Sequence, residues 1–336
     1  MTPARATFPP PEAVPLVVAE IGGNHGGDVE LAVRMIEAAV GAGCRAVKFQ
    51  TYVTERLVAR TDAAFAELER ERLCADDFRV LADVCKRADM TFLSTPFDEV
   101  SADLLEALEV PAFKIASGDL THLPLLRHVA RKGRPMLVSV GAGTWEEIDT
   151  AVAVIRAAGD PPLVLLQCTA AYPCPDAGAN LAAIPALARR YGVPVGFSDH
   201  TLGIEVALGA VALGAVLVEK HFTTDPTLPG GDNAMSIDPA ALARLVSESR
   251  RVRVALGSGE RRVDASEAPL RPLFRRGARA ARDIVAGSPV TTDDVTFVRP
   301  QTGLSPAELD AALPARARRL ISRGDPVTGQ DLVRDR

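Results

Sequence analysis

Short apolar runs alternate with longer segments of helical periodicity over the first 260 residues of the chain. The apolar runs predict eight strands, over residues 16–20, 46–50, 91–95, 112–116, 135–139, 163–167, 194–198 and 216–220. The segments between them predict helices over residues 29–40, 76–87, 102–108, 123–132, 145–158, 181–191 and 203–213, and a last helix follows over 239–256. Ser101 as an N-cap, and Thr144 with Glu147 as a capping box, mark two of the helix starts.

Strands that are apolar throughout, in strict alternation with helices, are typical of a closed parallel barrel covered by helices. We therefore predict an α/β protein with a (β/α)8 TIM barrel over residues 15–260. The proline-rich residues 1–14 are expected to form an N-terminal extension.

The composition changes after Gly257. Residues 261–276 are rich in arginine and contain Pro269 and Pro272, which predicts a linker. Further on, residues 284–295 (IVAGSPVTTDDV) are echoed by residues 321–332 (ISRGDPVTGQDL). We therefore predict a small β-rich domain with two related halves over 277–336.

The overall composition narrows the class of protein. A chain of 336 residues with 47% hydrophobic and 24% charged residues can bury a full core. Its net charge of −5 argues against a nucleic-acid partner. The five cysteines are odd in number and lack CxxC spacing, which favours a reduced, cytoplasmic compartment. No apolar run approaches the length needed to cross a bilayer, so we expect neither export nor membrane insertion.

Polar residues follow each predicted strand at its carboxyl end, where barrel enzymes place their chemistry. A single serine or threonine at such a place is more often a cap or a turn former, but the whole set favours an enzyme. The residues expected to ring this mouth are Glu20, Lys48, Gln50, Ser94, Lys114, Ser117, Ser139, Thr169, Ser198, His200 and His221.

Two lysines, Lys48 and Lys114, lie inside apolar strands. Because a buried lysine is costly without an anion, one interpretation is an ion pair with Glu20, Asp119 or Glu219. The other is that both lysines hold a dianionic substrate group such as phosphate. The hydroxyls that would complete this cradle belong to Ser117, Ser139 and Ser198.

Two histidines, His200 and His221, follow neighbouring strands. Such a pair is a plausible half-site for a divalent first-row metal, with water and substrate oxygens as the remaining ligands. We expect His122 and His128, near a helix start, to be solvated. Cys168 is expected to be a small barrel residue rather than a nucleophile.

Eight short motifs are spread along the chain: AEIGGNHGGD (19–28), VKFQTY (47–52), FLSTPFD (92–98), KIASGDLT (114–121), QCTAAYPCP (167–175), GFSDHTLG (196–203), EKHFT (219–223) and LPGGD (228–232). Together they resemble the sialic acid synthase, or nonulosonic acid synthase, family, and the C-terminal repeat resembles that family's antifreeze-like (SAF, β-clip) domain. The resemblance implies a transferase that condenses phosphoenolpyruvate with an N-acylated hexosamine such as N-acetylmannosamine. The expected products are a nine-carbon 2-keto-3-deoxy sugar acid and phosphate.

The resemblance also implies roles for particular residues. His200 and His221 would bind the metal, which would be Mn²⁺, with Mg²⁺ or Co²⁺ as alternatives. Glu20 or Asp119 would position the attacking water or handle its proton. Residues expected to hold phosphoenolpyruvate are Lys48, Lys114, Ser117, Ser139 and Ser198, and those expected to contact the sugar are Gln50, Tyr172 and Asp232. The family forms domain-swapped homodimers, in which Arg299 would reach the sugar's N-acyl group in the partner's site.

Several positions depart from the family pattern and leave the sugar open: Asp119, SVGAG (139–143), Ala170, Asn233 and Gln301. A legionaminate or pseudaminate synthase acting on a diacetamido sugar is therefore an alternative. A metal-dependent barrel aldolase that does not use phosphoenolpyruvate is a second alternative, although the paired lysines argue against it. A non-catalytic sugar sensor is a third, although both histidines and both lysines are intact.

Overall fold

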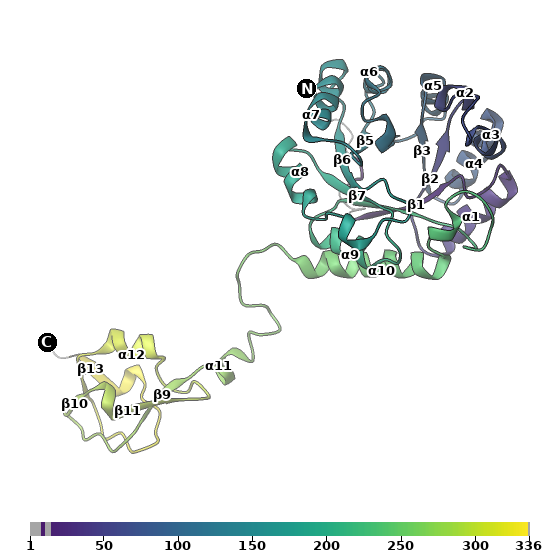
Figure 1. The fold of residues 1–336 in the computed structure, drawn as a ribbon. Coiled ribbons are helices and arrows are strands. Elements are labelled where there is room, and N and C mark those ends of the chain that lie inside the picture. Colours follow the sequence, from purple (N-terminus) through teal and green to yellow (C-terminus); the bar gives the residue numbers. More distant parts are fainter. Residues whose placement is uncertain (1–7, 11–14, 335–336) are drawn as a thin grey trace. The chain divides into compact units, whose positions relative to one another are not determined.

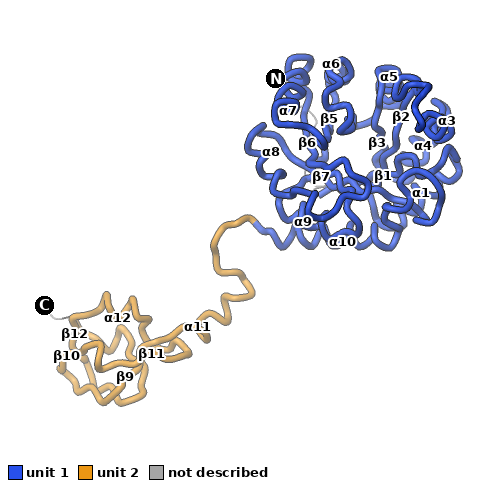
Figure 2. The backbone as a smooth tube through the Cα atoms, viewed as in Figure 1, with its two compact units in different colours: residues 1–257 blue, residues 258–336 orange. Residues whose placement is uncertain are grey.

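The computed structural model describes residues 8–10 and 15–334, so most of the expected N-terminal extension lies outside the described residues. The chain divides into two compact units, Met1–Gly257 and Ser258–Arg336 (Figure 2).

The first unit is an eight-stranded parallel sheet whose strands alternate with helices along the chain (Figure 1). The strands are β1 (Leu16–Gly22), β2 (Ala46–Thr51), β3 (Thr91–Pro96), β4 (Phe113–Ile115), β5 (Met136–Ser139), β6 (Leu163–Cys168), β7 (Val195–Asp199) and β8 (Leu217–His221). The hydrogen-bonded order is β3-β2-β1-β8-β7-β6-β5-β4, and β3 and β4 lie next to each other, which nearly closes the ring. The prediction of a (β/α)8 barrel is therefore confirmed.

The helices of this unit are α1 (Val29–Gly41), α2 (Thr54–Leu57), α3 (Phe65–Glu71), α4 (Ala75–Arg87), α5 (Glu99–Ala107), α6 (Leu123–Ala130), α7 (Trp145–Ala158), α8 (Ala183–Tyr191), α9 (Glu205–Ala212) and α10 (Pro239–Leu256). The eight predicted helices are present, each within three residues of its predicted ends, whereas α2 and α3 were not predicted. The Thr144–Glu147 capping box of α7 is confirmed. The prediction of Ser101 as an N-cap is wrong, because Asp98 caps α5 and accepts hydrogen bonds from the Ser101 N–H and hydroxyl, each at 2.8 Å.

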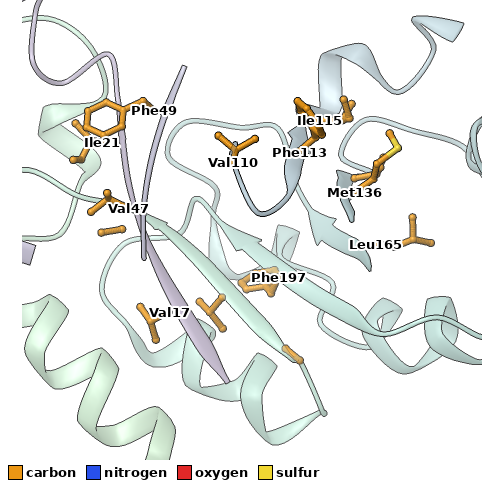
Figure 3. Close-up of a cluster of buried hydrophobic side chains, with 14 of the residues drawn as sticks. Val17, Ile21, Val47, Phe49, Val110, Phe113, Ile115, Met136, Leu165 and Phe197 are labelled. Carbon is orange, nitrogen blue, oxygen red and sulfur yellow. The ribbon is translucent and has the colours of Figure 1, made fainter. Parts of the chain in front are cut away.

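Each barrel strand presents alternate residues to the helices and to the barrel interior. The cluster drawn in Figure 3, which includes Val17, Val47, Phe49 and Phe113, packs between the strands and the surrounding helices. The opposite positions, such as Leu16, Val18, Ala46, Leu93 and Leu217, form a second apolar cluster that contains Phe8. Interior positions nearer the carboxyl ends of the strands are polar. The barrel interior is therefore apolar toward the amino ends of the strands and polar at the mouth formed by their carboxyl ends.

The second unit contains α11 (Arg271–Phe274), β9 (Gly277–Ala280), β10 (Pro289–Val290), β11 (Val295–Val298), α12 (Pro306–Ala312), β12 (Ala315–Ala317) and β13 (Leu332–Arg334). Its two halves use the same hydrogen bonds. Asp294 accepts from Thr291 and Arg282, and Asp331 accepts from Thr328 and Arg319 at equivalent places. Because Ile284 and Ile321 also pair across an antiparallel bridge, the predicted internal repeat is confirmed.

None of the helices in the described ranges combines the length and the hydropathy needed to cross a bilayer.

Candidate active site

The predicted site residues meet at the polar mouth of the barrel. Most of them line one cavity of about 160 Å³, and the exceptions are Ser94, Asp119, Thr169 and Arg299. The residues come from the carboxyl ends of the strands and from the loops that follow, as expected for a barrel enzyme.

The two lysines of the cavity are buried and paired with carboxylates. Lys48 Nζ lies 2.9 Å from Glu20 Oε2 and 3.8 Å from Glu219 Oε1, and it donates to Thr95 Oγ1 at 2.7 Å. Lys114 Nζ lies 3.6 Å from the same Glu219 oxygen and donates to the carbonyl of Ile115 at 3.2 Å. The ion-pair interpretation is therefore confirmed for Glu20 and Glu219, and Glu219 is the carboxylate that the two lysines share.

The two glutamates have pKa values that move in opposite directions. Burial raises the pKa of Glu20 from 4.5 to about 7, although Lys48 opposes the shift. Burial also works against ionisation of Glu219, but Lys114, Lys48 and a 3.0 Å hydrogen bond from Ser198 outweigh it and lower the pKa to about 2. Glu219 is therefore ionised at neutral pH, whereas Glu20 can hold or release a proton.

The histidine pair has the features of an open metal half-site. The ring centroids of His200 and His221 lie 5.3 Å apart. His200 Nδ1 lies 2.8 Å from the Thr169 carbonyl, an acceptor, so this nitrogen carries the hydrogen and Nε2 is left for a ligand. His221 Nδ1 is buried without a hydrogen-bond partner, although Asp232 Oδ2 lies 3.3 Å away. Burial lowers the pKa of His221 to about 3, which keeps its ring neutral and able to bind a cation.

The donor set fits a metal that takes its remaining ligands from water and substrate. Within residues 8–10 and 15–334, no group of three or more His, Cys, Asp or Glu side chains could hold a metal by itself. Two imidazoles and a nearby carboxylate leave several coordination positions for exogenous oxygens, as catalytic sites do.

The serine hydroxyls are placed differently from one another. Ser139 Oγ is buried without a hydrogen-bond partner, so a ligand oxygen could accept from it. Ser117 Oγ accepts from the Gly141 N–H at 3.0 Å. A Cβ at Gly141 would lie 2.7 Å from that same oxygen, so a larger residue there would displace the Ser117 hydroxyl from this position.

The residues predicted to face the sugar lie at the rim. Tyr172 is 55% exposed, and its ring centroid lies 4.2 Å from that of His200. Gln50 Nε2 lies 3.4 Å from Glu20 Oε1. Asp232 is fixed by its backbone, because its N–H donates to Asn24 Oδ1 at 2.8 Å.

One of the departures from the family pattern, Asn233, has a structural role. Its amide donates to the Gly230 carbonyl at 3.0 Å, and its Oδ1 accepts from Thr223 Oγ1 at 2.6 Å. It therefore holds the loop that carries Asp232.

Asp119 and Arg299, which were predicted to act in the reaction and to contact the sugar, do not line the cavity. Asp119 belongs to a 3₁₀ turn at 117–119 whose first residue, Ser117, lines the cavity. Burial raises the pKa of Asp119 to about 6, and His122 Nδ1 lies 3.7 Å from its Oδ1. Arg299 is exposed in the second unit, and its contact with a partner chain stays a prediction.

Ser94 and Thr169 were expected at the mouth but do not line the cavity, which is lined instead by their neighbours Thr95 and Cys168. Ser94 is buried against Thr51, with 2.7 Å between the hydroxyl oxygens, and Thr169 Oγ1 donates to the Gly178 carbonyl. Glu219 was considered only as an ion-pair partner, yet it lies in the site. Its position two residues before His221, on the same strand face, is the signal that identifies it.

The fold and the cavity define a (β/α)8 barrel with two buried lysines and two histidines at the carboxyl-terminal mouth, where barrel enzymes carry their active sites. The comparisons with known proteins narrow this class. The NeuB family model matches residues 35–261, and the SAF domain model matches residues 275–333.

Individual relatives agree with the family models. The N,N'-diacetyllegionaminic acid synthase of Legionella pneumophila is 37% identical, over 92% of this chain and 92% of the relative. The N-acetylneuraminate-9-phosphate synthase of Mus musculus is 32% identical, over 83% and 82%. The crystal structure of N-acetylneuraminic acid synthetase from Leptospira borgpetersenii has a TM-score of 0.74 at 38% identity, and covers 76% of this chain and 89% of its own.

The chain therefore belongs to the NeuB family of nonulosonic acid synthases, transferases that form a carbon–carbon bond, and it carries the SAF domain as well.

Proposed function

We propose that this synthase condenses phosphoenolpyruvate with the open-chain form of an N-acylated hexosamine, giving a nine-carbon 2-keto-3-deoxy sugar acid and phosphate. The observation that carries the proposal is the pair of buried lysines, which share one firmly ionised carboxylate, Glu219. When Glu20 is protonated, two ammonium groups face a single negative charge. That surplus positive charge, beside the unpartnered Ser139 hydroxyl, suits a small polyanion.

His200 and His221 would hold a divalent cation, which we propose to be Mn²⁺, with Mg²⁺ or Co²⁺ as alternatives. When bound, such a cation supplies Lewis-acid polarisation of the sugar's aldehyde and holds the two substrates together. The hydrogen bond from His200 to the Thr169 carbonyl keeps that ring oriented for the task.

Glu20 is the residue best placed to handle a proton. The terminal carbon of phosphoenolpyruvate forms the new bond to the sugar's aldehyde carbon, and water adds to the second carbon of phosphoenolpyruvate. Protonated Glu20, with a pKa near 7, would give its proton to the aldehyde oxygen as the carbon–carbon bond forms and then accept one proton of the adding water. The hydroxyl proton that remains on the second carbon would leave with phosphate as the carbon–oxygen bond to phosphate breaks and the keto group forms. Because phosphate departs by carbon–oxygen cleavage, oxygen-18 from labelled water should appear in the keto acid. Its appearance in the phosphate would rule out this route.

The sugar is proposed as a class rather than as a single compound. Relatives of this chain are named for legionaminic acid and for N-acetylneuraminate synthesis. The candidates therefore include N-acetylmannosamine and diacetamido hexoses, which differ in a few hydroxyl and acylamino groups.

The test is phosphate release from phosphoenolpyruvate with Mn²⁺ across a panel of these sugars. We expect release with one sugar, and its loss with EDTA or in His221→Ala. His128→Ala is the matched control, since His128 lies in α6, pairs with Asp103 and should be dispensable. Turnover of a sugar without phosphoenolpyruvate would favour the aldolase instead. Tight sugar binding without any turnover would favour the sensor.

A further inference from the structure

A second buried ion pair lies directly behind the histidines. Lys220 Nζ lies 2.8 Å from Asp199 Oδ2, and the two side chains are 1% and 0% exposed. Asp199 immediately precedes His200, and Lys220 immediately precedes His221. Since successive residues of a strand point to opposite faces, this pair lies on the helix side of the strands that present the histidines to the barrel mouth.

The pair closes the turn that carries His200. Asp199 Oδ1 accepts from the Thr201 N–H at 2.9 Å and from the Thr201 hydroxyl at 2.8 Å. Lys220 also donates to the Thr201 carbonyl. The residues on both sides of His200 are thereby tied to the strand that carries His221.

The pair also links the two strands at one register position, because Asp199 and Lys220 are direct partners in the ladder between β7 and β8. A slip of one strand by one residue there would turn the histidine that this strand positions away from the cavity and separate the two imidazoles. Buried ion pairs add little to stability compared with apolar residues of the same volume, but they can enforce a particular geometry. Groups behind metal ligands commonly orient those ligands.

We infer that Asp199 and Lys220 are positioning residues that set the separation and orientation of His200 and His221 for a divalent cation. The inference rests on the proposed function, because it takes the two histidines as the metal ligands.

The experiment compares Mn²⁺ binding to metal-free protein, measured by electron paramagnetic resonance, in the parent and in an Asp199→Asn/Lys220→Met double variant. Asparagine keeps an acceptor for Thr201, methionine fills the lysine's volume, and no charge is left buried alone. We expect the Kd for Mn²⁺ to rise about 10- to 100-fold. The Kd of metal-free protein for phosphoenolpyruvate should stay unchanged, which a general loss of structure would not allow.

Lys132→Met is the matched control. Lys132 is also a shielded lysine, 7% exposed, but it pairs with Asp103 and Glu106 and has no link to the histidines. Its loss should leave Mn²⁺ affinity unchanged.

The outcomes separate the two proposals. A parent protein that binds no Mn²⁺ would overturn the metal assignment itself. A parent and a folded double variant that bind Mn²⁺ equally would overturn only the positioning role. If the double variant does not fold, Thr201→Val removes a single hydrogen bond to Asp199 and keeps both charges. We then expect a several-fold weaker Mn²⁺ affinity, and an unchanged value would overturn the inference.

Discussion

Replacing Glu20 by glutamine tests the electrostatics of the site directly. The folded-state pKa of Glu20 is raised above its ordinary value because the carboxyl is buried. The folded protein therefore keeps a proton that the unfolded chain releases. The stability that this proton contributes is fully present below about pH 4.5 and is lost as the pH rises through about 7. Glutamine resembles the protonated carboxyl and does not titrate, so the variant should not show this loss.

The magnitude follows from the size of the shift. A rise from 4.5 to about 7 is roughly 2.5 pH units, and each unit corresponds to about 1.4 kcal/mol. The full effect is therefore about 3 kcal/mol, of which a part is already lost at pH 5. Relative to the parent, Glu20→Gln should gain about 2 to 3 kcal/mol in free energy of unfolding between pH 5 and pH 8.

The assay is urea unfolding of metal-free protein followed by tryptophan fluorescence. Trp145 is the single tryptophan of the chain and begins α7, so its signal reports on the barrel alone. Glu219→Gln is a second test. The charge of Glu219 contributes to the raised pKa of Glu20, so its removal should make the free energy of unfolding less dependent on pH than in the parent. Parallel pH dependences for Glu20→Gln and the parent would refute the raised pKa of Glu20.

Three further predictions concern ligand binding. Lys114→Met should weaken phosphoenolpyruvate binding about 10- to 100-fold without changing Mn²⁺ affinity, because a charged hydrogen bond of about 1.5–3 kcal/mol is lost. A phosphoenolpyruvate affinity equal to that of the parent, measured by calorimetry, would contradict the role of Lys114 in binding the anion. Ser139→Ala removes a buried hydroxyl that has no hydrogen-bond partner, so the free energy of unfolding should stay level or rise by up to about 1 kcal/mol. The affinity for phosphoenolpyruvate should fall. A marked loss of stability would show that the hydroxyl makes a hydrogen bond in the folded protein. His221→Ala should abolish Mn²⁺ binding with the thermal unfolding cooperative and intact, and retained Mn²⁺ affinity would remove His221 from the metal site.

The barrel could be predicted from the sequence because its strands are buried on both faces. Such strands appear as apolar runs, and all eight lie within two residues of their predicted ends. Helices with a capping signal or a long apolar stripe, such as α7 and α10, begin and end at the predicted residues. The short helix α3 was missed because none of its residues is buried, so it has no apolar periodicity to detect.

The site could be predicted where a charged residue interrupts an apolar strand, as Lys48 and Lys114 do. It could not be predicted where adjacent polar residues compete for the same position. Ser94 and Thr95 are both polar, and only the register of β3 decides that Thr95 faces Lys48. Because a shift of one residue moves a side chain to the opposite face of a strand, composition alone cannot choose between such neighbours.

The different roles of Glu20 and Glu219 show what three-dimensional placement adds. They are the same residue type, both are buried, and both contact Lys48. Glu219 has a second lysine and the Ser198 hydroxyl within reach, and this extra support is enough to keep it ionised. Glu20 has Lys48 as its close cation, and the effect of burial on its pKa is larger than the opposing effect of this lysine. The pKa of Glu20 therefore moves toward neutrality. In active sites, two groups of the same type can have different pKa values because their environments differ. One group then stays charged while the other can carry a proton.

The sequence left Glu20 and Asp119 as equal candidates for the proton carrier. Glu20 is favoured because it lines the cavity beside the lysines, whereas Asp119 does not.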